Sequence, residues 1–130
     1  MQPKRILIVD DEATFTRMVR LNLEQTKRYM VREENCAQNA LTTAREFKPD
    51  LILLDVIMPG VDGGELASRI KADAAFKHVP VVFLTGTVTK QEAAAGAVTG
   101  GYPLLSKPVS LKSLVECMEN VFAAKAHEKE

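Results

Sequence analysis

Five side chains that could do chemistry stand at or just after the ends of short apolar segments in this sequence. They are Asp10, Asp11, Asp55, Thr85 and Lys107. Carboxylates brought close together repel one another, and a divalent cation with oxygen ligands, such as Mg²⁺, relieves that repulsion. A carboxylate can also attack phosphorus, while a metal, a lysine and a hydroxyl balance the charge on the transferring phosphoryl group. If the fold gathers these side chains, they form a cation site that accepts a phosphoryl group.

Each of these residues also has a structural explanation when it is taken alone. Asp10 and Asp11 could cap a helix, and Asp55 could form a turn. Thr85 could be an ordinary strand residue, and Lys107 a solvated surface lysine. Their order favours the joint chemical interpretation, because unrelated causes rarely place such residues at successive strand ends.

Apolar periodicity predicts five strands that alternate with five helices. The strands are expected over 5–9, 29–34, 50–54, 79–84 and 102–105, and the helices over 11–25, 37–47, 62–70, 91–98 and 111–122. Asp62 and Ser110 are expected N-caps, Pro49 should stop the second helix, and 58–64 has the composition of a loop.

This alternation indicates an α/β fold, with a doubly wound five-stranded parallel sheet and helices on both faces. The flavodoxin-like strand order 2-1-3-4-5 suits five strands, and sites in such sheets form at the carboxyl ends of the strands. The topology therefore brings the five side chains to one edge. The strand over 29–34 alone ends without an obvious chemical group.

Composition narrows the class of protein. The chain has 130 residues, which fits one domain over 1–123 followed by a polar tail over 124–130. Lys plus Arg and Asp plus Glu both number 17, so charge gives no reason to expect nucleic acid or an anionic membrane as a direct partner. The apolar runs are too short for a bilayer span or a signal peptide, which makes the cytoplasm the expected compartment. Cys36 and Cys117 lack metal-ligand spacing and are expected to be plain thiols.

Four segments carry a family resemblance: ILIVDDE from residue 6, DLILLDVIMPGVDG from residue 50, VPVVFLTG from residue 79 and SKPV from residue 106. In this order they resemble the receiver domain of two-component response regulators, of the single-domain, chemotaxis-regulator kind. The resemblance covers roughly residues 4–122. Because the receiver begins close to Met1, it is expected to stand alone or to lie at the N-terminus of a longer protein.

The resemblance implies a role for each acidic residue. Asp55 would be the phosphoacceptor, and a sensor histidine kinase, a histidine phosphotransfer protein or a small phosphodonor would supply the phosphoryl group. Asp11 would bind Mg²⁺ (or Mn²⁺) directly and Asp10 mainly through water. Asp55 and the backbone carbonyl of Ile57 would complete the protein ligands. Such a domain assists its own phosphorylation and dephosphorylation rather than acting as an enzyme on other substrates.

The resemblance also implies a switch. Lys107 would pair with the phosphoryl group, Thr85 would move in to hydrogen-bond it, and the Lys107–Pro108 peptide bond would be cis. A downstream target protein would then bind the face built from the helix over 91–98, the strand over 102–105 and the last helix. Leu104 stands where receivers commonly carry Tyr or Phe, so we expect the loop after Thr85 and the helix over 91–98 to carry the change.

Three other classes of protein remain to be weighed. A phosphatase of the haloacid dehalogenase type needs a D-x-D pair where this chain has Asp10-Asp11-Glu12. A flavin carrier needs a phosphate loop rich in Ser, Thr and Gly at the same place, where acids would repel a bare phosphate. A phosphorylation-independent interaction domain that keeps only the fold is the most serious alternative, because only activity excludes it.

Overall fold

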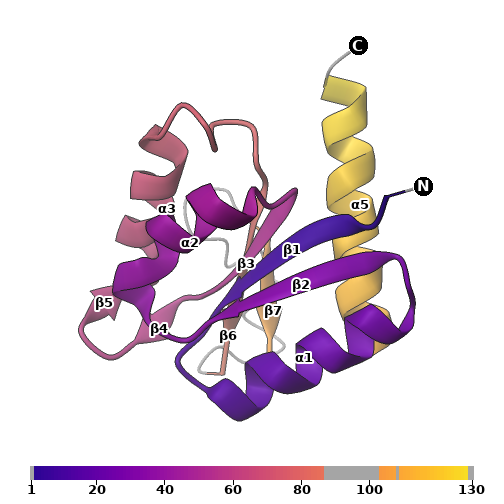
Figure 1. Cartoon of the computed structure of the whole chain (residues 1–130), viewed down its shortest axis with the longest axis horizontal. Helices are drawn as coiled ribbons and strands as arrows, with labels where there is room; N and C mark the ends of the chain where they lie inside the picture. The colour runs from indigo at the N-terminus through magenta and orange to yellow at the C-terminus, as the bar shows by residue number, and fades with distance from the viewer. Residues whose placement is uncertain (1, 87–102, 108, 129–130) are drawn as a thin grey trace.

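The computed structural model describes residues 2–86, 103–107 and 109–128, which build a five-stranded parallel sheet (Figure 1). The strand order is β2-β1-β3-β6-β7, so the predicted order 2-1-3-4-5 is confirmed. The sheet strands are β1 (Lys4–Val9), β2 (Tyr29–Glu34), β3 (Leu51–Asp55), β6 (Val81–Thr85) and β7 (Leu104–Ser106). The helices are α1 (Ala13–Gln25), a 3₁₀ turn η1 (Ala37–Asn39), α2 (Ala40–Phe47), α3 (Gly63–Ala72) and α5 (Leu111–Glu128).

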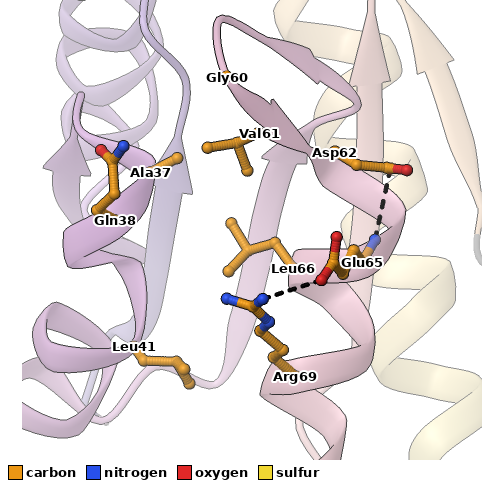
Figure 2. A pocket seen from close by; sticks show the side chains of 9 residues that line it. All are labelled: Ala37, Gln38, Leu41, Gly60, Val61, Asp62, Glu65, Leu66 and Arg69. Atoms are coloured by element: carbon orange, nitrogen blue, oxygen red, sulfur yellow. Dashed lines mark hydrogen bonds and ion pairs between the residues drawn. The ribbon is translucent and has the colours of Figure 1, made fainter.

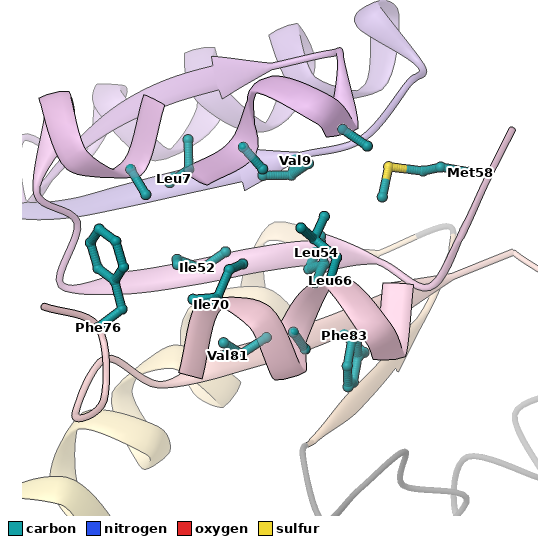
Figure 3. Packing of buried hydrophobic residues seen from close by; sticks show 14 of the residues in the cluster. Leu7, Val9, Ile52, Leu54, Met58, Leu66, Ile70, Phe76, Val81 and Phe83 are labelled. Carbon is teal, nitrogen blue, oxygen red and sulfur yellow. The ribbon is translucent and has the colours of Figure 1, made fainter. Parts of the chain in front are cut away.

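The strands are apolar on both faces because helices cover both sides of the sheet. Side chains alternate along each strand, so Leu7 and Val9 join one cluster while Ile6 and Ile8 join the other. The first cluster, part of which Figure 3 shows, packs against α2 and α3. The second packs against α1 and α5. Two separate cores thus hold the sheet between two helical layers, and its carboxyl edge is left for polar residues.

The predicted helix boundaries have local causes that the structure confirms. Asp62 caps α3, because its Oδ1 accepts hydrogen bonds from the Gly64 and Glu65 amides at 2.8 and 3.4 Å. Ser110 caps α5 in the same way, accepting from the Ser113 amide at 3.1 Å. Helix α2 ends before Pro49 in a left-handed residue, Lys48, with φ of 57°.

The structure differs from the sequence-based expectations at three places. The expected loop over 58–64 contains a small antiparallel hairpin of β4 (Ile57–Met58) and β5 (Val61–Asp62), which the positive φ of Gly60, 73°, allows to turn tightly. Helix α5 continues to Glu128, beyond the start of the expected polar tail at 124, since Ala and Lys favour helix there. The second helix begins as the 3₁₀ turn η1. The expected helix over 91–98 lies outside the described residues.

No helix in the described ranges combines the length and hydrophobicity that crossing a bilayer requires.

Gly63 sets how closely α3 approaches the end of β3. Its amide donates to the Val56 carbonyl at 3.0 Å. A Cβ atom at this position would lie 2.7 Å from the Asp55 carbonyl oxygen and 2.7 Å from both Cα and the carbonyl oxygen of Val56. Only glycine therefore lets the helix start directly against the backbone that carries Asp55.

We expect Gly63→Ala to lower the free energy of unfolding by about 1–3 kcal/mol, because the new methyl group overlaps backbone atoms that cannot rotate away. Urea denaturation followed by circular dichroism measures this change. Gly64→Ala, one residue further into α3, controls for the gain in helix propensity when alanine replaces glycine. Equal stability of Gly63→Ala and wild type would show that α3 can move away from β3 without cost.

Candidate functional site

The chemical side chains meet at the carboxyl edge of the sheet, as predicted. Asp10 follows β1, Asp55 and Thr85 are the last residues of β3 and β6, and Lys107 follows β7. Asp10, Asp55 and Thr85 are buried, with exposed fractions of 0, 4 and 1%, whereas Asp11 is exposed. One carboxylate oxygen from each of Asp10, Asp11 and Asp55 lies within 4.8 Å of the other two. The parallel topology thus concentrates negative charge at one place.

Lys107 reaches into this acid cluster instead of extending into solvent. Its Nζ lies 2.6 Å from Asp10 Oδ2, 2.9 Å from Glu12 Oε1 and 3.6 Å from Asp55 Oδ2, and its side chain is only 12% exposed. Burial alone lowers the pKa of a lysine, but the contacts with Asp10 and Glu12 and the charge of Asp55 outweigh burial and raise the pKa of Lys107. The ammonium is therefore charged at neutral pH. It also lies 4.5 Å from the centre of the Phe15 ring, a cation–π distance.

The structural explanations of the acid pair and the lysine do not hold. The N-cap of α1 is Glu12, and no side-chain hydrogen bond caps the helix there, so neither Asp10 nor Asp11 is its capping residue. Oδ1 of Asp10 instead accepts a hydrogen bond from the Glu12 amide at 2.9 Å. Lys107 is largely enclosed, which a solvated surface lysine would not be.

The donor set fits a hard divalent cation. Asp10 Oδ2 is buried and faces the Lys107 ammonium at 2.6 Å, and the described part of the chain brings it no other hydrogen-bond donor. A buried carboxylate oxygen with spare acceptor capacity is costly unless charge or a metal compensates it. Together with Asp11 and Asp55 it offers the oxygen ligands that Mg²⁺ prefers. Ile57 lies two residues beyond Asp55, in β4.

Thr85 and Lys107 are joined through the backbone. The Lys107 amide donates to the Thr85 carbonyl at 2.7 Å, and Thr85 pairs with Ser106 in the register of β6 and β7. Leu104 pairs with Phe83 in the same register and packs, half-buried, against the first apolar cluster. The Lys107–Pro108 peptide bond falls outside the described residues, because Pro108 is not among them.

A hollow of about 230 Å³ lies between η1–α2 and the start of α3 (Figure 2). Leu41, Val61 and Leu66 contribute its apolar lining. Its polar groups are already engaged, since Asp62 caps α3 and Glu65 pairs with Arg69 at 2.9 Å. None of Asp10, Asp11, Asp55 and Lys107 is among the residues that line this hollow.

Two residues of the site were missed by sequence reasoning. Glu12 is the third acid in the Asp10-Asp11-Glu12 run, yet only the pair was assigned a role; its contact with Lys107 spans 95 residues of sequence. Gly63 was counted as part of a loop. A glycine directly after a capping aspartate was the available signal that α3 starts in close contact with another segment.

Comparison with known proteins gives concordant results. The family described as the response regulator receiver domain matches residues 6–119. The phosphate regulon transcriptional regulatory protein PhoB of Pseudomonas aeruginosa is 37% identical over 121 residues, which cover 93% of this chain and 52% of PhoB. The chain thus spans about half the length of such relatives. Protein PilH of the same organism is 31% identical, covering 92% of this chain and 98% of PilH.

The fold is also similar to that of solved structures. The chemotaxis protein CheY4 of Vibrio cholerae superposes with a TM-score of 0.78 and is 27% identical, covering 92% of this chain and 98% of CheY4.

We expect millimolar Mg²⁺ to raise the melting temperature of the wild-type protein, because a cation that binds only the folded state stabilises it. Asp11→Ala removes one repelling carboxylate, so it should raise the stability of the metal-free protein by about 0.5 kcal/mol and abolish the Mg²⁺ effect. Differential scanning calorimetry with and without EDTA measures both. Glu46→Ala, a change of an acid on α2, is the control. A full Mg²⁺ response in Asp11→Ala would place the metal elsewhere.

Removing the Lys107 ammonium should destabilise the metal-free protein and strengthen metal binding. Lys107→Ala leaves buried Asp10 without its cation, a loss of about 1–3 kcal/mol in unfolding free energy. Because the ammonium no longer competes for Asp10 Oδ2, Mg²⁺ should stabilise this variant more than it stabilises wild type. Urea denaturation over a range of Mg²⁺ concentrations tests this, with exposed Lys77 replaced by alanine as control. Weaker Mg²⁺ binding in Lys107→Ala would contradict competition between the two cations.

Proposed function

The chain belongs to the response regulator receiver domain family, the phosphorylation-dependent signalling domain of two-component systems, and we propose that Asp55 is its phosphoacceptor. Asp55 ends the central strand of the sheet, which β1 and β6 flank on either side. The observation that carries this proposal is the convergence on Asp55 of the acid pair and the lysine. Its Oδ2 lies 3.6 Å from Lys107 Nζ, and its carboxylate shares the 4.8 Å cluster with Asp10 and Asp11.

The reaction that this site supports is transfer of a phosphoryl group to a carboxylate. An oxygen of Asp55 forms a bond to phosphorus as the bond between phosphorus and the donor's leaving group breaks, which leaves an aspartyl phosphate. Lys107 sits where it can pair with a phosphoryl oxygen, and the Thr85 hydroxyl can donate one hydrogen bond to another. Bound Mg²⁺ supplies further positive charge for those oxygens.

The metal would be held by Asp10, Asp11 and Asp55, with the backbone carbonyl of Ile57 as a further ligand. The acid cluster with its buried Asp10 oxygen supports this assignment. Lys107 neutralises part of the cluster through its contact with Asp10. A bound Mg²⁺ would supply that positive charge instead, and the Lys107 ammonium would then be available to pair with a phosphoryl oxygen.

Membership of the receiver family supports the proposed partners. The phosphodonor is a sensor histidine kinase or a histidine phosphotransfer protein, and the compartment is the cytoplasm. A downstream protein binds the phosphorylated form through the face that includes β7 and α5. Thr85 and Leu104 belong to the switch, since they lie at the end of β6 and in β7 beside it.

Acetyl phosphate labelling tests the proposed function. With Mg²⁺, the intact mass of the wild-type protein should rise by one phosphoryl group, and EDTA should prevent the rise. Asp55→Asn keeps the shape of the side chain but removes the nucleophilic carboxylate, so labelling should disappear. Asp62→Asn, in which the new residue still caps α3, is the matched control and should label normally. Single-site labelling of Asp55→Asn would refute the assignment, and an unlabelled wild type would favour an interaction domain that works without phosphorylation.

A further inference from the structure

A chain of hydrogen bonds leads from α1 through β2 to the backbone of Asp10. Arg20 Nε donates to Glu33 Oε2 at 2.5 Å, and the Thr16 hydroxyl lies 2.7 Å from Glu33 Oε1. Asn35 Nδ2 then donates to Thr16 Oγ1 at 2.9 Å and to the Asp10 carbonyl oxygen at 2.8 Å. The end of β2, which was expected to bring no chemical group, therefore contacts the acid pair through Asn35.

The chemical nature of each donor and acceptor fixes the direction of each hydrogen bond in this series. The Asp10 carbonyl can only accept, so the amide nitrogen of Asn35 must face it. Burial works to raise the pKa of Glu33, but hydrogen bonds from Thr16 and Arg20 outweigh it, and the pKa is lowered. Glu33 is therefore a carboxylate, which accepts the hydrogen bond that the Thr16 hydroxyl donates. Oγ1 of Thr16 is then left to accept the second amide hydrogen of Asn35.

These contacts hold the peptide group that links Asp10 to Asp11. The carbonyl of that peptide group accepts from Asn35. The preceding peptide group, Val9–Asp10, is held separately, because the Asp10 amide donates to the Glu34 carbonyl at 3.1 Å on the neighbouring strand. The orientation of the Asp10–Asp11 peptide group decides where the Asp11 side chain points, since Asp11 lies in a bend with no strand partner of its own. Groups that orient metal ligands without touching the metal commonly contribute to metal affinity.

We propose that Asn35 is a positioning residue, which holds the Asp10–Asp11 peptide in the orientation that presents both carboxylates to Mg²⁺. This inference rests on the proposed function of the site. Asn35 itself is exposed, so shortening its side chain leaves no buried cavity. Its loss should therefore act on metal affinity more than on the fold.

Magnesium titration of four variants tests the role of Asn35. Binding is measured by isothermal titration calorimetry at a temperature where all the variants are folded. Asn35→Ala should weaken Mg²⁺ binding about tenfold. Thr16→Val, which removes the acceptor that holds the amide, should weaken it less, and Thr16→Ser, which keeps the hydroxyl, should bind as wild type does. Thr43→Val, which removes a different hydrogen bond to β2, from Thr43 to Glu34, is the control and should leave affinity unchanged.

Hydrogen exchange in the metal-free protein supplies a second measurement. The amides of Asp11 and Glu12 should exchange faster in Asn35→Ala than in wild type or Thr43→Val. Unchanged Mg²⁺ affinity in Asn35→Ala, with wild type binding normally, would overturn the positioning role and leave the proposed function intact. Absence of Mg²⁺ binding in wild type itself would overturn both.

Discussion

The ion pairs of Lys107 are the interaction on which the site depends. Asp10 and Asp55 are buried, and a buried charge is tolerated only with a compensating partner. Lys107 supplies that partner from the last strand of the sheet, through Nζ contacts to both. The contact joins β1, β3 and β7, so the acid edge holds its shape only when strands far apart in sequence have assembled.

Parallel topology is what makes this assembly possible. Each strand of the sheet delivers the residue at its carboxyl end to the same edge, and the apolar residues before it fix the register by packing into two cores. β1, β3 and β6 could be predicted from the sequence because each contains an unbroken run of at least four apolar residues. The same rule predicted that Asp10, Asp55, Thr85 and Lys107 would lie at this edge of the sheet.

Contacts that form only when segments far apart in the sequence come together could not be predicted from the sequence. Glu12 belongs to the site because it contacts Lys107, which lies 95 residues away in the sequence. Asn35 donates a hydrogen bond to the carbonyl of Asp10, and nothing in the composition around Asn35 indicates such a bond. Gly63 is required because α3 starts against the backbone of Asp55 and Val56. The hairpin of β4 and β5 was missed because two-residue strands leave no periodic signal.

The backbone bond between the Lys107 amide and the Thr85 carbonyl has a mechanical consequence. This bond joins the end of β6 to the residue that follows β7. A backbone shift at the end of either strand towards Asp55 would therefore also shift the other. The backbone that carries the Thr85 hydroxyl is thereby linked directly to the backbone that carries the Lys107 ammonium.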